Sequence, residues 1–153
     1  MSDTPRCRVL VVEDEPLVGM EIEDAIGELG HDVVGPIAEL HEALALALDG
    51  ELCCAILDIN IRGGLSYPVA DILRRRGVPI LLTSGYDVQT LPDRLHGETL
   101  LQKPFTNGQL NLELRNLCAR AMDSQRKSAI RNSASSLPGS TVGARLVVDA
   151  KGS

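Results

Sequence analysis

Short apolar runs alternate with amphipathic stretches along the first 122 residues, and this alternation constrains the fold more than any other feature. Runs typical of strands buried on both faces occupy residues 8–12, 31–34, 52–57, 78–83 and 99–102. Apolar residues at helical spacing occupy residues 16–29, 37–48, 65–76, 87–95 and 106–122. Strands that alternate with helices form βαβ units. The sequence therefore predicts an α/β fold, with a five-stranded parallel sheet and helices on both faces.

The length and composition are those of one globular domain. The chain has 153 residues, of which 44% are hydrophobic and 24% charged, which excludes a disordered or collagen-like chain. Aromatic residues are rare, so the core is expected to be aliphatic. The sequence has no run of 18 apolar residues and no signal-peptide core, so we expect a cytoplasmic protein without a membrane partner. The four cysteines lack metal-site spacing, and Cys53 and Cys54, which lie in an apolar run, are predicted to be buried thiols.

Charge divides the chain into an acidic body and a basic tail. The net charge of −6 argues against general binding of nucleic acid. Residues 1–122 carry ten basic and nineteen acidic side chains, whereas residues 123–153 carry five and two. The tail is also rich in serine. We therefore predict a folded domain over residues 7–122 and a disordered basic tail over residues 123–153, in which the apolar residues 146–148 could dock.

Chemically active side chains follow four of the five predicted strands. Ligands of open α/β sheets bind outside the carboxyl ends of the strands. The residues found there are Glu13, Asp14 and Glu15 after the first strand, Asp58 and Asn60 after the third, Ser84 and Tyr86 after the fourth, and Lys103, Pro104 and Phe105 after the fifth. We expect these side chains to face one crevice.

This set of side chains suits phosphoryl transfer. Clustered carboxylates repel one another, and a hard cation such as Mg²⁺ relieves that repulsion. A lysine and a serine hydroxyl can donate hydrogen bonds to phosphate oxygens. A carboxylate can attack a phosphoryl group to form an aspartyl phosphate. Mg²⁺ is therefore the expected cofactor.

The strand-end motifs resemble those of the receiver domain of bacterial two-component response regulators. The matching motifs are VVEDEP at 11–16, LDIN at 57–60, TSGY at 83–86 and QKPF at 102–105, and the resemblance covers residues 7–120. It implies a flavodoxin-like sheet with strand order 2-1-3-4-5.

The resemblance implies a role for each site residue. Asp58 would be the phosphoacceptor. Glu13 and Asp14 would form the acidic pair, with Asp14, Asp58 and the backbone carbonyl of Asn60 on Mg²⁺ and Glu13 acting mainly through water. The residues implied to contact the phosphoryl group are Ser84, as the switch hydroxyl, and Lys103, and the bond before Pro104 is a candidate cis peptide.

One position departs from the pattern of many receivers. The switch aromatic three residues before the lysine is replaced by Leu100, and Tyr86 is the candidate aromatic instead. The chain resembles a subgroup of mostly stand-alone receivers with a Gly-Tyr turn after the fourth strand.

The resemblance implies a signalling switch that is not an enzyme. Its phosphoryl donor would be a histidine kinase or a histidine phosphotransfer protein, its output would be contact with a downstream protein, and a homodimer is left open. Two alternatives stay open: a phosphohydrolase with an aspartyl-phosphate intermediate, and a degenerate interaction module that is not phosphorylated. Asn60, where the hydrolase would carry an acid, disfavours the first, and the intact acids with Lys103 disfavour the second.

Overall fold

The computed structural model describes residues 6–85 and 91–135, without the side chains of residues 132–135. The chain divides into two units, Met1–Met122 and Asp123–Ser153, and each is described by itself. The first unit holds the sheet and every predicted site residue that the structure describes.

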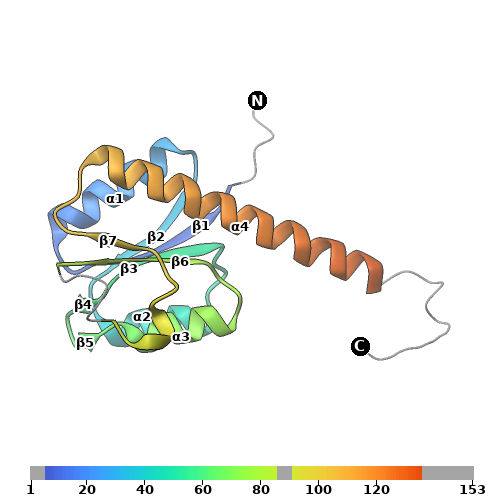
Figure 1. The fold of residues 1–153 in the computed structure, drawn as a ribbon, viewed down its shortest axis with the longest axis horizontal. Coiled ribbons are helices and arrows are strands. Elements are labelled where there is room, and N and C mark those ends of the chain that lie inside the picture. The colour runs from blue at the N-terminus through green and yellow to red at the C-terminus, as the bar shows by residue number, and fades with distance from the viewer. Residues whose placement is uncertain (1–5, 86–90, 136–153) are drawn as a thin grey trace. The chain divides into compact units, whose positions relative to one another are not determined.

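Five strands form the central sheet of the first unit (Figure 1). They are β1 (Arg8–Val12), β2 (Asp32–Ile37), β3 (Cys54–Asp58), β6 (Ile80–Ser84) and β7 (Leu100–Gln102). The order across the sheet is β2-β1-β3-β6-β7, and every neighbouring pair is parallel. Counted over the sheet strands alone, this is the order 2-1-3-4-5, so the predicted fold class is confirmed.

Helices cover both faces of the sheet. They are α1 (Pro16–Glu28), α2 (Leu40–Asp49), α3 (Tyr67–Arg75) and α4 (Asn107–Ser135). In Figure 1, α2 and α3 lie on one face, and α1 lies on the other with the part of α4 that belongs to the first unit. In the described part of the chain, the helices pack on the two faces of the sheet and not over the carboxyl ends of its strands.

The core is aliphatic, as predicted, and lies on both faces of the sheet. Alternate residues of β1 enter different clusters, with Leu10 and Val12 on the α2 and α3 side and Val9 and Val11 on the α1 and α4 side. Each fully buried Leu, Ile or Val side chain contributes about 1.5–3 kcal/mol. The four cysteines are free thiols, and three of them are fully buried, whereas Cys53 is half-buried.

Strand β2 runs three residues beyond its predicted end because the Gly35–Pro36 dipeptide continues it. Proline is tolerated there because β2 is an edge strand, where an N–H is not needed for pairing. Gly35 has a φ of +115°, and a Cβ atom there would lie 2.6 Å from the carbonyl oxygen of Val11, so glycine is required. The strand then brings the Ile37 carbonyl to accept a 2.9 Å hydrogen bond from the backbone N–H of Glu13.

A small hairpin that the sequence did not predict follows β3. It consists of β4 (Asn60–Ile61) and β5 (Gly64–Leu65), which pair antiparallel. The turn between them uses positive φ angles at Gly63 and Gly64. The hairpin is joined to the start of α2, where the N–H of Leu40 donates to the carbonyl of Arg62. It therefore fixes the chain that leaves Asp58.

The prediction of a helix over residues 87–95 is wrong where the structure describes them. Residues 86–90 lie outside the described part of the chain, and the remainder holds only a 3₁₀ helix, Asp93–Leu95. Pro92 has no N–H to donate to a preceding turn. Among residues 91–95, only Leu91 and Leu95 are buried, which is little apolar surface to hold a longer helix.

Helix α4 continues past residue 122, where we predicted that the tail begins. Residues 123–135 are helical rather than disordered, and residues 136–153, with the apolar patch at 146–148, lie outside the described part. The extension has no Gly or Pro, and Asp123 pairs with Arg126 and Lys127 one turn later. Both features favour a helix.

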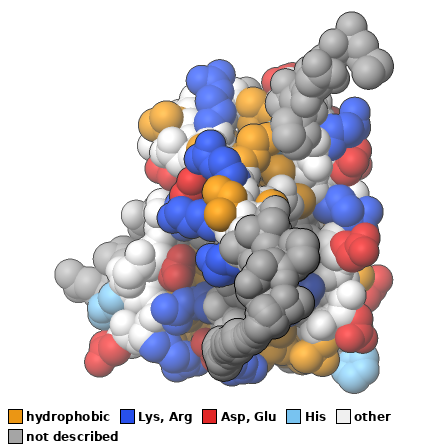
Figure 2. Space-filling view, turned by 90° about the vertical axis from the view of Figure 1, so that its right-hand side faces the viewer, with side chains coloured by type: hydrophobic (Ala, Val, Ile, Leu, Met, Phe, Trp, Pro, Cys, Tyr) orange, Lys and Arg blue, Asp and Glu red, His pale blue; other side chains and the backbone are white. Residues whose placement is uncertain are grey.

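The surface carries charges of both signs. In Figure 2, basic and acidic side chains lie side by side, and hydrophobic side chains form only small separate patches on the face shown. Across residues 6–85 and 91–135, no helix is both long and apolar enough to cross a membrane.

Candidate functional site

The candidate site lies where the carboxyl ends of four parallel strands meet. Glu13 and Asp14 follow β1, Asp58 ends β3, Ser84 ends β6 and Lys103 follows β7. Backbone hydrogen bonds tie these ends together: the N–H of Ile59 donates to the Thr83 carbonyl at 3.0 Å, and the N–H of Lys103 donates to the Ser84 carbonyl at 2.7 Å. The site residues therefore lie on strand ends that are joined by backbone hydrogen bonds.

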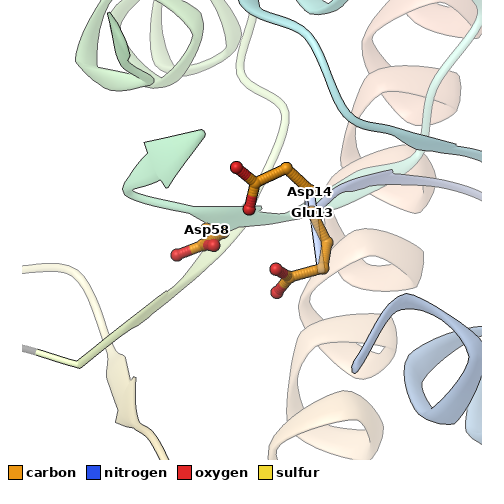
Figure 3. Close-up of side chains that lie close together, drawn as sticks. All are labelled: Glu13, Asp14 and Asp58. Carbon is orange, nitrogen blue, oxygen red and sulfur yellow. The ribbon is translucent and has the colours of Figure 1, made fainter. Parts of the chain in front are cut away.

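Three carboxylates converge at this edge of the sheet (Figure 3). One oxygen each of Glu13, Asp14 and Asp58 lies within 4.8 Å of the others. Glu13 and Asp58 are 3% and 5% exposed, whereas Asp14 is half-buried and open to solvent on one side. A cluster of three carboxylates that is partly open to solvent fits a hard divalent cation such as Mg²⁺, because this ion keeps part of its water shell.

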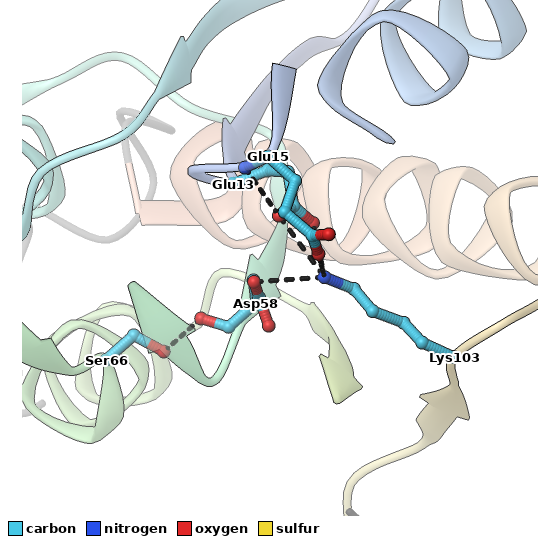
Figure 4. A network of polar contacts seen from close by, with 5 residues as sticks. All are labelled: Glu13, Glu15, Asp58, Ser66 and Lys103. Carbon is cyan, nitrogen blue, oxygen red and sulfur yellow. Dashed lines mark hydrogen bonds and ion pairs between the residues drawn. The ribbon is translucent and has the colours of Figure 1, made fainter. Parts of the chain in front are cut away.

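The ammonium group of Lys103 lies among carboxylates (Figure 4). Its Nζ atom donates to Oδ2 of Asp58 at 3.1 Å, to Oε2 of Glu13 at 3.2 Å and to Oε1 of Glu15 at 2.7 Å. It also lies 3.1 Å from Oε1 of Glu13, but that oxygen accepts no hydrogen bond from any residue that the structure describes. One positive charge thus faces an excess of negative charge.

This charge imbalance changes how the site binds protons. Burial, and then the charge of Asp58, raise the pKa of Glu13 to about 7, although the Glu15 N–H and Lys103 oppose the rise. Burial lowers the pKa of Lys103, but its hydrogen bonds with Glu15, Glu13 and Asp58 outweigh burial and hold that pKa above its usual value. Lys103 therefore stays charged. A second cation would further reduce the repulsion among the carboxylates of the cluster.

Glu15 belongs to this network, although the sequence indicates only an acid at a strand end. It is the N-cap residue of α1, but its side chain makes no capping hydrogen bond to the helix and reaches Lys103 instead. Its backbone N–H donates to Oε2 of Glu13 at 3.1 Å. Its side chain is 60% exposed, unlike those of Glu13 and Asp58.

Ser66 is a second residue that sequence reasoning missed. Its hydroxyl donates to the backbone carbonyl of Asp58 at 2.7 Å, and its N–H donates to the carbonyl of Ile59 at 2.8 Å. Ser66 is 1% exposed and precedes α3 without capping it. Residue 66 falls inside the helix predicted over residues 65–76, and the sequence indicates no contact with Asp58. The structure instead uses the hydroxyl to hold the backbone of Asp58.

We expect the substitution Ser66→Ala to lower the free energy of unfolding by about 1–2 kcal/mol, because it removes a buried hydrogen-bond donor. The control is Ser128→Ala on the exposed surface of α4, which should change stability by less than about 0.5 kcal/mol. Urea denaturation of both variants measures the difference. Equal stabilities for the two variants would show that the Ser66 hydroxyl does not support Asp58.

The remaining predicted residues have different surroundings. Ser84 is 2% exposed, and Asn60 is exposed at the start of β4. Tyr86, the candidate switch aromatic, lies outside the described residues. Leu100 packs partly buried on the α2 and α3 side of the sheet. The Lys103–Pro104 peptide bond is cis.

Comparison with known proteins places this chain in a family. No family model matches the chain. A curated relative, the phyllosphere-induced regulator PhyR of Methylorubrum extorquens, is 34% identical over 101 residues, which cover 63% of this chain and 38% of PhyR. The chain spans half or less of the length of the curated relatives it matches.

Solved structures match over most of their length. The structure of SdrG from Sphingomonas melonis is 36% identical with a TM-score of 0.63, and the match covers 76% of this chain and 97% of SdrG. The response regulator receiver domain of PhyR from Erythrobacter litoralis is 28% identical with a TM-score of 0.61, over 76% of this chain and 90% of that domain. The chain belongs to the receiver domain family of response regulators. The family predicted from the four strand-end motifs is thus confirmed, and a receiver domain is a signalling module.

Proposed function

We propose that this receiver domain is a phosphorylation-activated signalling switch and that Asp58 is its phosphoryl acceptor. The arrangement around Asp58 carries the proposal. Its carboxylate is buried at a strand end, close to two further carboxylates and 3.1 Å from the ammonium group of Lys103. An acceptor with a nearby lysine and a cluster fit for a cation has what phosphoryl transfer requires.

Asp58 acts as the nucleophile in this proposal. An oxygen of its carboxylate attacks the phosphorus of the donor, the bond between phosphorus and the leaving group breaks, and an aspartyl phosphate forms. The leaving group departs with the bonding electrons and takes up a proton. Lys103 donates a hydrogen bond to a phosphoryl oxygen, and the hydroxyl of Ser84 at the end of β6 donates to another.

The acid cluster is the proposed Mg²⁺ site. Asp14, Asp58 and the backbone carbonyl of Asn60 would hold the ion, and Glu13 would act through a water molecule. When bound, Mg²⁺ supplies positive charge that offsets repulsion between the acids and an incoming phosphoryl group. Ser66 keeps the Asp58 backbone in place at this point of the chain.

Two solved relatives support an activated state and an output through another protein. SdrG has also been solved in a conformation described as BeF₃-activated, and this chain is 38% identical to it over 94% of that chain. A solved PhyR from Bartonella quintana is described as an anti-anti-sigma factor. We propose a histidine kinase or histidine phosphotransfer protein as the donor for this chain, with protein–protein contact as its output.

The test is phosphorylation by a small donor. We expect incubation with acetyl phosphate and Mg²⁺ to raise the intact mass by one phosphoryl group, and EDTA to prevent the gain. Asp58→Asn should stay unmodified, whereas Asp24→Asn, which changes an exposed acid on α1, should be modified like the parent. If the parent gains no phosphoryl group, even from a histidine phosphotransfer donor, the proposal fails.

A further inference from the structure

We propose that Glu15 competes with the phosphoryl group on Asp58 for the ammonium group of Lys103, and so weakens phosphoryl binding. This inference rests on the proposed function. It assigns a role to the N-cap residue of α1, which is neither the acceptor nor one of the three clustered carboxylates. Glu15 would set how readily the domain enters its activated state.

The first argument is the number of donors on Lys103. An ammonium group has three N–H donors. The hydrogen bonds to Glu13, Glu15 and Asp58 occupy all three. Lys103 can therefore donate to a phosphoryl oxygen only when a carboxylate gives up its hydrogen bond or shares it.

The second argument is which contact can yield. The side chains of Glu13 and Asp58 are 0% and 6% exposed, and the backbone N–H of Glu13 is also fixed to β2. The Glu15 side chain is 60% exposed, so water can replace Lys103 as its partner. Glu13 remains a carboxylate when Asp58 carries the phosphoryl group, and its side chain has no exposed surface at which water could replace Lys103. Glu15 is therefore the partner that Lys103 releases.

The third argument is room to move. Glu15 and Lys103 line one cavity of about 440 Å³, together with Val18, Glu21, Pro104 and Phe105. The Glu15 side chain makes no capping hydrogen bond to α1, so the helix does not hold this side chain in place. The contact between Glu15 and Lys103 is also the shortest of the three, at 2.7 Å, which makes it a real competitor in the unmodified protein.

The experiment measures affinity for beryllofluoride, which adds to a carboxylate in place of a phosphoryl group but dissociates. The full chain is titrated with beryllofluoride at saturating Mg²⁺, and binding is followed by NMR of backbone amides. Glu15→Gln should bind about two- to fivefold more tightly than the parent, the range expected when an exposed ion pair is removed. The control is Glu21→Gln, which removes a negative charge from the same cavity and should change affinity by less than about 1.5-fold.

Each outcome decides the question. Equal tightening by both variants would show a general effect of charge, and weaker binding by Glu15→Gln would show that Glu15 helps Lys103. Either result overturns the inference while leaving the acceptor role of Asp58 intact. No binding by the parent would instead remove the proposed function and the inference with it. In a Lys103→Met background, Glu15→Gln should no longer tighten binding; if that background does not fold, the comparison with Glu21→Gln decides.

Discussion

Lys103→Met is expected to lower the free energy of unfolding of the metal-free protein by about 3 kcal/mol at pH 8. Lys103 is the charged partner of Glu13 and Asp58, whose side chains are 0% and 6% exposed. Removing one partner of a buried ion pair leaves uncompensated charge in a poorly solvated place. Urea denaturation in EDTA measures the loss.

Magnesium gives this prediction a second part. A cation bound among the carboxylates would compensate them in place of Lys103, so saturating Mg²⁺ should restore much of the lost stability. Lys127→Met is the matched control, since Lys127 pairs with Asp123 on an exposed part of α4 and should contribute less than about 1 kcal/mol. Similar losses for the two lysine variants would show that Lys103 does not compensate buried charge.

The metal-free protein is also expected to become less stable by about 2–3 kcal/mol between pH 5 and pH 8, because of Glu13. The pKa of Glu13 rises from 4.5 to about 7 on folding. Between these values the folded state keeps a proton that the unfolded state has released, so stability falls as the pH rises. The contribution is fully present below pH 4.5 and is lost as the pH passes about 7.

Glu13→Gln should remove this dependence, because glutamine does not titrate. The variant and the parent are compared by urea denaturation in EDTA at several pH values. Their difference isolates Glu13 from other groups, such as His31, whose pKa is lowered by burial and by the charge of Arg6 and which acts in the opposite direction. A parent and a variant with parallel pH profiles would contradict the raised pKa of Glu13.

The sheet could be predicted because its strands are buried on both faces. Such strands appear in the sequence as continuous apolar runs, and the helices that connect them indicate that neighbouring strands are parallel. The end of the edge strand β2 was harder to predict, because an edge strand tolerates a Gly-Pro dipeptide and β2 continues through Gly35–Pro36. The prediction for the C-terminal part gave too much weight to serine content, and residues 123–135 form a helix supported by ion pairs.

The candidate site was predictable as a set of residues, because strand ends of a parallel sheet meet. Glu13, Asp14, Asp58 and Lys103 could be listed from the sequence alone. The contacts of Glu15 and Ser66 could not be predicted, since no motif or spacing in the sequence links either residue to its partner. Their actual partners, Lys103 and the Asp58 backbone, lie on other elements, and only the packed fold brings them together.

The most direct test of the central claim is chemical identification of the phosphorylated side chain. After incubation with acetyl phosphate and Mg²⁺, borohydride reduces an aspartyl phosphate to homoserine and releases phosphate. Peptide mass spectrometry then identifies the residue present at each acidic position. We predict homoserine at position 58, and intact aspartate or glutamate at positions 13, 14 and 15. An unchanged Asp58 in a protein whose intact mass shows one added phosphoryl group would contradict the claim that Asp58 is the acceptor.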